Sequence, residues 1–275
     1  MIARQTSFLR FFYLPFYSQL YSLFCAATVS VLTTLILGGV SFLLSLALTT
    51  SAQANEATVV KFYKAKKLLA QMYQDEHQQT FYCGCRYNHH GKKLIPQLDS
   101  CGYQVRKQEK RANRIEWEHI VPAWQFGHQL QCWQTGGRKA CRKDPKFAYM
   151  EGDMHNLVPS IGEVNGDRSN YGFNEWNGVA HQYGHCDMLV DFKARKVQPP
   201  QHSKGQIARA YLYMQQRYGF KLSKQDKRLY EAWHARFPAT EWECKKNQKV
   251  YSIQKNANPF ITGCTTLGTQ VQVAN

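Results

Sequence analysis

Eight cysteines spread along the chain constrain its fold more than any other feature of the sequence. They are Cys83, Cys85, Cys101, Cys132, Cys141, Cys186, Cys244 and Cys264, and a ninth, Cys25, lies in the apolar N-terminal segment. An even number of cysteines in an exported chain is typical of a disulfide framework, so we predict four disulfides and leave their pairing open. A zinc site is the weaker alternative. Cys83 and Cys85 are the one close pair of cysteines, and no second Cys-x₂-Cys or His pair would complete the site.

Export is predicted from the first 54 residues. They contain no Asp or Glu, their only charges are Arg4 and Arg10, and an apolar run extends from residue 21 to residue 48. Ala52 and Ala54 form a small-x-small cleavage site, so we interpret residues 1–54 as a secretory signal and residues 55–275 as the mature domain. A retained membrane anchor is the alternative, since residues 32–48 are apolar enough to span a bilayer. We therefore expect a periplasmic or secreted protein.

The predicted mature chain is strongly basic. It holds 33 of the 35 Lys and Arg residues and all 19 Asp and Glu residues, an excess of 14 positive charges. Such an excess favours a polyanionic partner, which is a nucleic acid, an anionic membrane or a polysaccharide.

The segment from Arg114 to His119 carries the first candidate chemistry. Ile115 and Trp117 suit a strand, and Glu116 and Glu118 alternate with them, so both carboxylates should lie on one face. Pro122 should end the strand, which delivers Glu118 and His119 to its terminus. A carboxylate beside an imidazole can be a metal ligand beside a general base. The alternative interpretation is a solvated edge strand.

A second informative segment covers residues 150–170. It contains a short apolar strand, then Ser160, which we expect to cap a helix together with Glu163 as a capping box. Asn165 would lie in that helix. Strand, loop, strand and helix form a ββα unit, and the oxygens of Glu118 and Asn165 suit Mg²⁺. The alternative for Asn165 is a polar residue on the surface of a helix.

Several basic residues are candidates for contacts with phosphate. Arg138 follows two glycines in a predicted loop that a disulfide between Cys132 and Cys141 would fix, and it suits bidentate phosphate binding. The other candidates are Lys107, Lys110, Arg111 and Arg114, which precede the Glu-His strand, and Arg168. A solvated loop is the alternative for the run before the strand.

Periodicity places the remaining elements. We predict helices over residues 55–78 and 204–220, a helix beginning at Ser223, a short strand over residues 81–85, and a turn over residues 88–91. Cys244 and Cys264 lie near the end of the chain, so we expect disulfide bonding to fix the C-terminal tail to the domain.

Together these motifs resemble the bacterial endonuclease I family, which comprises periplasmic or secreted non-specific nucleases. The matching segments cover essentially the whole mature chain: Phe81-Tyr82-Cys83-Gly84-Cys85, Cys101 to Lys107, Arg114 to Trp124, Gly136-Gly137-Arg138-Lys139, Asp153-Met154-His155-Asn156-Leu157, Gly162 to Arg168 and Trp242-Glu243-Cys244. One departure is the segment at residues 88–91, where relatives usually have an aromatic residue before the turn.

The resemblance implies an α+β fold: a mixed α/β single domain, stapled by disulfides, around a ββα-metal (His-Me finger) motif. It implies that Glu118 and Asn165 bind one Mg²⁺, with Mn²⁺ or Ca²⁺ as substitutes, that His119 is the general base and that Arg138 binds phosphate. It implies cleavage of DNA and RNA to 5′-phosphate ends. We also expect a monomer without a stable protein partner. The main alternative is a non-catalytic exported nucleic-acid-binding protein, which would need the charge but not Glu118, His119 and Asn165 together.

Overall fold

The predicted Glu-His strand lies at the centre of the fold. In a computed structural model that describes residues 58–264, strand β3 (Ile115–His119) pairs antiparallel with β4 (Leu157–Ile161), so that Glu118 lies opposite Val158. Helix α7 (Gly162–Arg168) follows β4 directly. The predicted signal, residues 1–54, lies outside the described residues.

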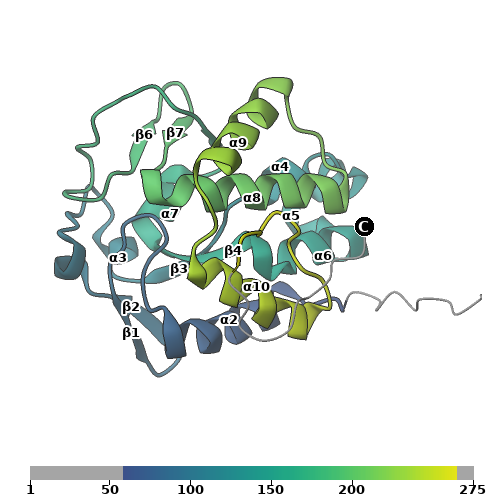
Figure 1. Ribbon diagram of the computed structural model, residues 1–275, viewed down its shortest axis with the longest axis horizontal. Helices are drawn as coiled ribbons and strands as arrows, with labels where there is room; N and C mark the ends of the chain where they lie inside the picture. The colour runs from purple at the N-terminus through teal and green to yellow at the C-terminus, as the bar shows by residue number, and fades with distance from the viewer. Residues whose placement is uncertain (1–57, 265–275) are drawn as a thin grey trace, which may run out of the picture. The chain divides into compact units, whose positions relative to one another are not determined.

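Helices cover this hairpin on two sides, as Figure 1 shows. Helices α8 (Gln201–Tyr218) and α9 (Lys224–Arg236) lie on one side, and α2 (Phe62–Glu76) and α10 (Glu241–Gln254) lie on the other. Two hydrophobic clusters match this arrangement: the larger one contains residues of α8 and α9, and the smaller one contains residues of α2 and α10. Leu157 belongs to the smaller cluster and Val158 to the larger, because successive strand residues point to opposite faces.

The remaining elements are short. Between β3 and β4 lie α4 (Ala123–Gly127), α5 (Gln131–Cys141), α6 (Pro145–Gly152) and the 3₁₀ turn η2 (Met154–Asn156). Before β3 come the hairpin of β1 (Tyr87–His90) and β2 (Lys93–Pro96), the 3₁₀ turn η1 (Leu98–Cys101) and α3 (Glu109–Ala112). A separate three-stranded sheet has the order β5 (Gly172–Phe173), β7 (Lys196–Gln198), β6 (Leu189–Asp191). The fold is therefore a mixed α/β single domain.

Four disulfides form, as the cysteine count predicts. The pairs are Cys83–Cys186, Cys85–Cys101, Cys132–Cys141 and Cys244–Cys264. The first joins residues 103 positions apart, so it ties the segment before β1 to the segment before β6. Within residues 58–264, no helix is long and apolar enough to cross a membrane.

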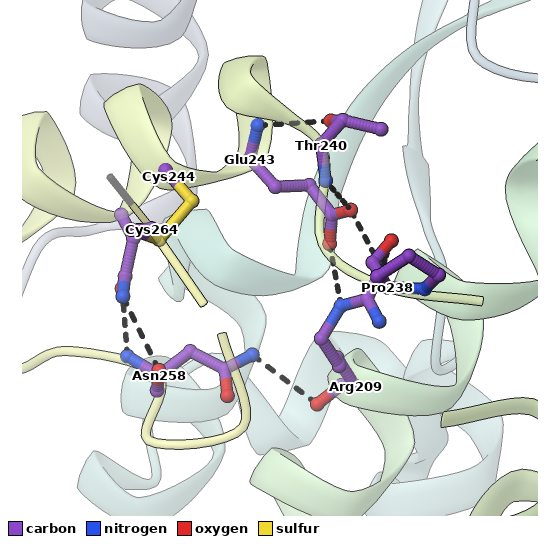
Figure 2. Close-up of a disulfide and its surroundings, with 8 residues drawn as sticks. Arg209, Pro238, Thr240, Glu243, Cys244, Asn258 and Cys264 are labelled. Atoms are coloured by element: carbon purple, nitrogen blue, oxygen red, sulfur yellow. Dashed lines mark hydrogen bonds and ion pairs between the residues drawn. A yellow bond between two sulfur atoms is a disulfide. The ribbon is translucent and has the colours of Figure 1, made fainter. Parts of the chain in front are cut away.

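The C-terminal disulfide, Cys244–Cys264, lies beside a buried ion pair, which Figure 2 shows. Arg209 of α8 donates to both carboxylate oxygens of Glu243, at 2.8 and 2.6 Å, and both residues are buried. Thr240 and Glu243 also form a capping box at the start of α10. The disulfide from Cys244 therefore holds the tail against a helix whose first turn is already fixed to α8.

Most of the predicted helices form with different ends. The first runs over Phe62–Glu76, with Ala65, Leu69, Met72 and Tyr73 buried, and the third begins after Ser223, whose side chain accepts from the backbone N–H of Asp226. At the predicted turn over residues 88–91, the first three residues belong to β1, and the chain turns at Gly91, where φ is +59°.

Three local predictions are wrong. Residues 81–85 form a turn and not a strand, because Gly84 has φ +68° and Thr80 accepts hydrogen bonds from the backbone N–H groups of Gly84 and Cys85. Ser160 does not cap α7, because pairing with β3 extends β4 to Ile161. The predicted loop between Cys132 and Cys141 is helix α5, interrupted at Gly136 and Gly137.

Candidate active site

A pocket of about 410 Å³ collects all four residues for which the sequence predicts chemistry. Glu118 and His119 enter it from the end of β3, Asn165 from α7 and Arg138 from the second half of α5. Phe62 of α2 also lines it, although it is remote from the others in sequence. The hairpin and helix thus place side chains separated by up to 47 residues in one cavity.

Glu118 is a buried carboxylate with one oxygen engaged. Its Oε1 accepts hydrogen bonds from Arg168 Nη1 and from the Tyr82 hydroxyl, both at 2.9 Å. Burial raises the pKa of Glu118 to about 7, against the lowering effect of Arg168 and Tyr82. Across residues 58–264, Oε2 has no hydrogen-bond partner, so this oxygen is left for a ligand in the pocket.

Asn165 is oriented by Glu116, the other carboxylate of β3. Asn165 Nδ2 donates to Glu116 Oε2 at 2.9 Å, and Arg111 and Arg114 donate to the same carboxylate. Burial opposes ionisation, but these arginine hydrogen bonds hold the pKa of Glu116 below its usual range. Because Nδ2 faces a carboxylate, Oδ1 is the amide atom that remains for a ligand. Both carboxylates line one pocket, as the alternation predicts.

His119 is held in one tautomer by the backbone. Its Nε2 lies 2.8 Å from the carbonyl oxygen of Glu151, which only accepts, so Nε2 carries the proton and Nδ1 has the lone pair. The ring packs against Phe62, with centroids 4.8 Å apart, and is only 8% exposed. Burial lowers the pKa of His119 to about 3, so the imidazole is neutral at neutral pH.

Arg138 is positioned by the same residue, Glu151. The break at Gly136 and Gly137, where φ of Gly137 is +59°, turns the second half of α5 so that Arg138 Nε donates to Glu151 Oε1 at 2.7 Å. The side chain remains 39% exposed and lines the pocket. The disulfide between Cys132 and Cys141 bridges this break, so it fixes the arginine as predicted, although within a helix.

Comparison with known proteins identifies the family of the chain. The sequence profile of the Endonuclease I family matches residues 42–264. The chain belongs to the endonuclease I family.

Three relatives show how close the similarity is. The chain is 62% identical over 201 residues to an extracellular deoxyribonuclease of Aeromonas hydrophila, covering 73% of this chain and 88% of the relative. It is 57% identical over 219 residues to a periplasmic deoxyribonuclease of Aeromonas hydrophila, covering 79% and 91%. It is 47% identical over 204 residues to Endonuclease-1 of Buchnera aphidicola subsp. Acyrthosiphon pisum (strain APS), covering 74% and 81%.

Glu151 is the residue of this endonuclease I chain that sequence reasoning missed. Its backbone carbonyl fixes the tautomer of His119, and its side chain holds Arg138. No local signal marks a residue that acts through its carbonyl group. The available hint in the sequence is a single acidic side chain between Met150 and Gly152, at the end of α6. In the structure, Glu151 is only 6% exposed.

The predicted phosphate contacts divide into three groups in this endonuclease I fold. Lys107 and Lys110 are exposed, as a phosphate contact requires, whereas Arg111 and Arg114 are bound to Glu116. Arg168 differs most from expectation, because its side chain is 0% exposed and pairs with Glu118. Its guanidinium also donates to the backbone carbonyls of His119 and Ile120. Arg168 therefore stabilises the site from inside and is not placed as a surface contact for nucleic acid.

Proposed function

We propose that this member of the endonuclease I family is an exported nuclease that hydrolyses phosphodiester bonds of DNA, and of RNA, with one Mg²⁺ held in the ββα unit of β3, β4 and α7. The observation that carries this proposal is the convergence of Glu118, His119, Arg138 and Asn165 on one pocket. The relatives named deoxyribonucleases support DNA as the substrate, and their extracellular and periplasmic names support export. The four disulfides fit an oxidising compartment.

The donor set fits a hard divalent cation. Glu118 Oε2 and Asn165 Oδ1 are oxygen atoms without hydrogen-bond partners in the described part of the chain, and both residues line the pocket. Among the side chains that the structure describes, no group of three or more His, Cys, Asp and Glu residues could hold a metal, so most positions around a cation here would be filled by water and phosphate. This suits Mg²⁺, with Mn²⁺ or Ca²⁺ as substitutes. When bound, the ion supplies positive charge that stabilises the phosphorane and the departing oxygen.

His119 would act as the general base through Nδ1. It takes a proton from a water molecule as the water oxygen attacks phosphorus. The bond from phosphorus to the 3′ oxygen breaks, the 3′ oxygen takes a proton from solvent water, and the product keeps a 5′-phosphate. His119 then releases its extra proton from Nδ1 to solvent. The Glu151 carbonyl holds Nε2–H throughout, so the ring cannot flip its donor toward the water. Burial keeps the ring neutral before each turnover.

Arg138 would stabilise the charge that develops on the phosphate. Its Nε is fixed by Glu151, and its side chain is partly exposed at the pocket. A guanidinium with free amino groups is a bidentate ligand for phosphate oxygens. Removing such a charged hydrogen bond should cost about 1.5–3 kcal/mol, or roughly ten- to a hundredfold in rate.

The test is cleavage of a plasmid by wild type, His119→Ala and His181→Ala, each with Mg²⁺ and with EDTA. His119→Ala should lose about 10²–10⁴-fold in rate while still binding DNA, because the basic surface is unchanged. His181 is exposed and does not line the pocket, so its variant is the matched control and should keep full activity. Cleavage by His119→Ala at the wild-type rate would refute the assignment. Binding without cleavage by the wild type would favour the non-catalytic alternative.

A further inference from the structure

A second, larger hollow adjoins the catalytic pocket. It has a volume of about 910 Å³ and lies between α2, the β1–β2 hairpin and the segment from α3 into β3. We call it the lysine groove. Lys66, Ile115 and Trp117 line both the lysine groove and the catalytic pocket, so the two hollows are neighbours.

The lysine groove is lined by positive charge, and no carboxylate is among the described residues that line it. Its basic side chains are Lys66, Lys67, Lys92, Lys93, Lys110 and Arg114. Arg114 is paired with Glu116, but none of the five lysines makes an ion pair with a carboxylate whose side chain the structure describes, which within residues 58–264 leaves out Asp75. Five unneutralised cations around one hollow favour a ligand with several negative charges along its length.

Aromatic and aliphatic side chains lie among these cations. Tyr63 of α2 is 67% exposed, and Trp117 of β3 is partly exposed at the junction with the catalytic pocket. Leu94 and Ile95 of β2 line the same hollow. Alternation of basic and aromatic groups is typical of surfaces that bind single-stranded nucleic acid, where phosphates contact the cations and bases stack on the rings. A duplex would keep its bases stacked on each other and would leave Tyr63 without this role.

We propose that the lysine groove binds the single-stranded segment of polynucleotide next to the scissile phosphate. The proposal rests on the proposed function, because the catalytic pocket defines where the scissile phosphate lies. Lys66 stands at the junction, and Lys92 and Lys93 lie on the β1–β2 hairpin, so the strand runs from the catalytic pocket toward this hairpin. Tyr63 and Trp117 provide stacking surfaces along the path.

The experiment measures binding in EDTA, so that it does not depend on catalysis. The dissociation constant of a labelled long single-stranded oligonucleotide is determined by fluorescence anisotropy for wild type and for Lys92→Glu/Lys93→Glu. The variant should bind at least tenfold more weakly. The slope of log Kd against log salt concentration should fall by about 0.7 for each phosphate group that the variant no longer neutralises. The matched control is Lys221→Glu/Lys224→Glu, the same charge change at exposed lysines next to the start of α9, which line neither hollow.

A second pair of variants tests stacking without changing the charge. Tyr63→Ala should weaken single-strand binding about fivefold or more, whereas Tyr63→Phe should retain it, because loss of one stacked base costs about 1–3 kcal/mol. Equal effects of the two double-lysine variants would overturn the proposal, since net charge alone would then explain binding. A larger loss for duplex than for single-stranded DNA would also overturn it. If the wild type fails to cleave a plasmid in the presence of Mg²⁺, the proposed function is refuted, but these binding results still stand.

Discussion

Replacing Arg168 by Met tests the buried half of the site. Arg168 is 0% exposed, donates to Glu118 Oε1 at 2.9 Å, and donates to the carbonyls of His119 and Ile120 at 2.9 and 2.6 Å. The variant leaves a buried carboxylate without its cation and two carbonyl groups without their donor. Removing one partner of a buried pair costs about 3–5 kcal/mol, a large part of the 5–15 kcal/mol typical of a domain.

The loss of unfolding free energy in Arg168→Met should grow as the pH rises above 7. The pKa of Glu118 is raised from its ordinary value to about 7 in the folded wild type, and Arg168 opposes that rise. Without Arg168 the folded pKa is higher still, so between pH 7 and that higher value the deficit grows by up to about 1.4 kcal/mol per pH unit. Well below pH 7, Glu118 is protonated in both proteins, and only the deficit from the two broken carbonyl hydrogen bonds remains.

The assay is urea unfolding of wild type, Arg168→Met, Glu118→Gln and the double variant, below and above pH 7. Adding Glu118→Gln to Arg168→Met should relieve part of the deficit above pH 7, because it removes the unpaired charge. Arg168→Met should also bind Mg²⁺ more weakly at pH 7 by calorimetry, with recovery at higher pH. A deficit that is the same at both pH values, or no relief from Glu118→Gln, would refute this account of the pair.

Two further predictions concern other parts of the fold. Lys246 is buried and donates to the Leu157 carbonyl at 2.7 Å, and burial lowers its pKa to about 7, so the folded state binds fewer protons than the unfolded state between pH 7 and 10.5. The free energy of unfolding of wild type should therefore rise relative to that of Lys246→Met by up to about 1.4 kcal/mol per pH unit over this window. Free energies of unfolding that change in parallel with pH in the two proteins would contradict this. Removing Cys83–Cys186 should cost about 5 kcal/mol of unfolding free energy and removing Cys132–Cys141 about 2.5, because the closed loops span 103 and 9 residues. Removal of the second bridge should nevertheless lower the rate of plasmid cleavage more, since that bridge spans the break before Arg138, and an equal fall in rate for both variants would argue against this role.

The sequence determined the local chemistry of this protein. Alternation of apolar and acidic residues from Ile115 to Glu118 predicted β3 and placed both carboxylates on one face, because a strand repeats every two residues. The count of cysteines predicted four disulfides. The positions of Glu118, His119 and Asn165 predicted that one ββα unit carries all three. In the structure they line one pocket, because β3 pairs with β4 and α7 follows β4 directly.

Tertiary structure decided which groups lie opposite one another. The chemistry of Arg168 suggested a phosphate contact, but α7 turns it inward to Glu118, which is 50 residues away in sequence. Glu151 acts on His119 through a backbone carbonyl, which every residue possesses and no sequence pattern marks. Ser160 carries the signature of a helix cap, yet pairing with β3 kept it in the strand. Local patterns report periodicity and side-chain chemistry, whereas these outcomes depend on contacts between distant segments, which form only when the whole chain packs.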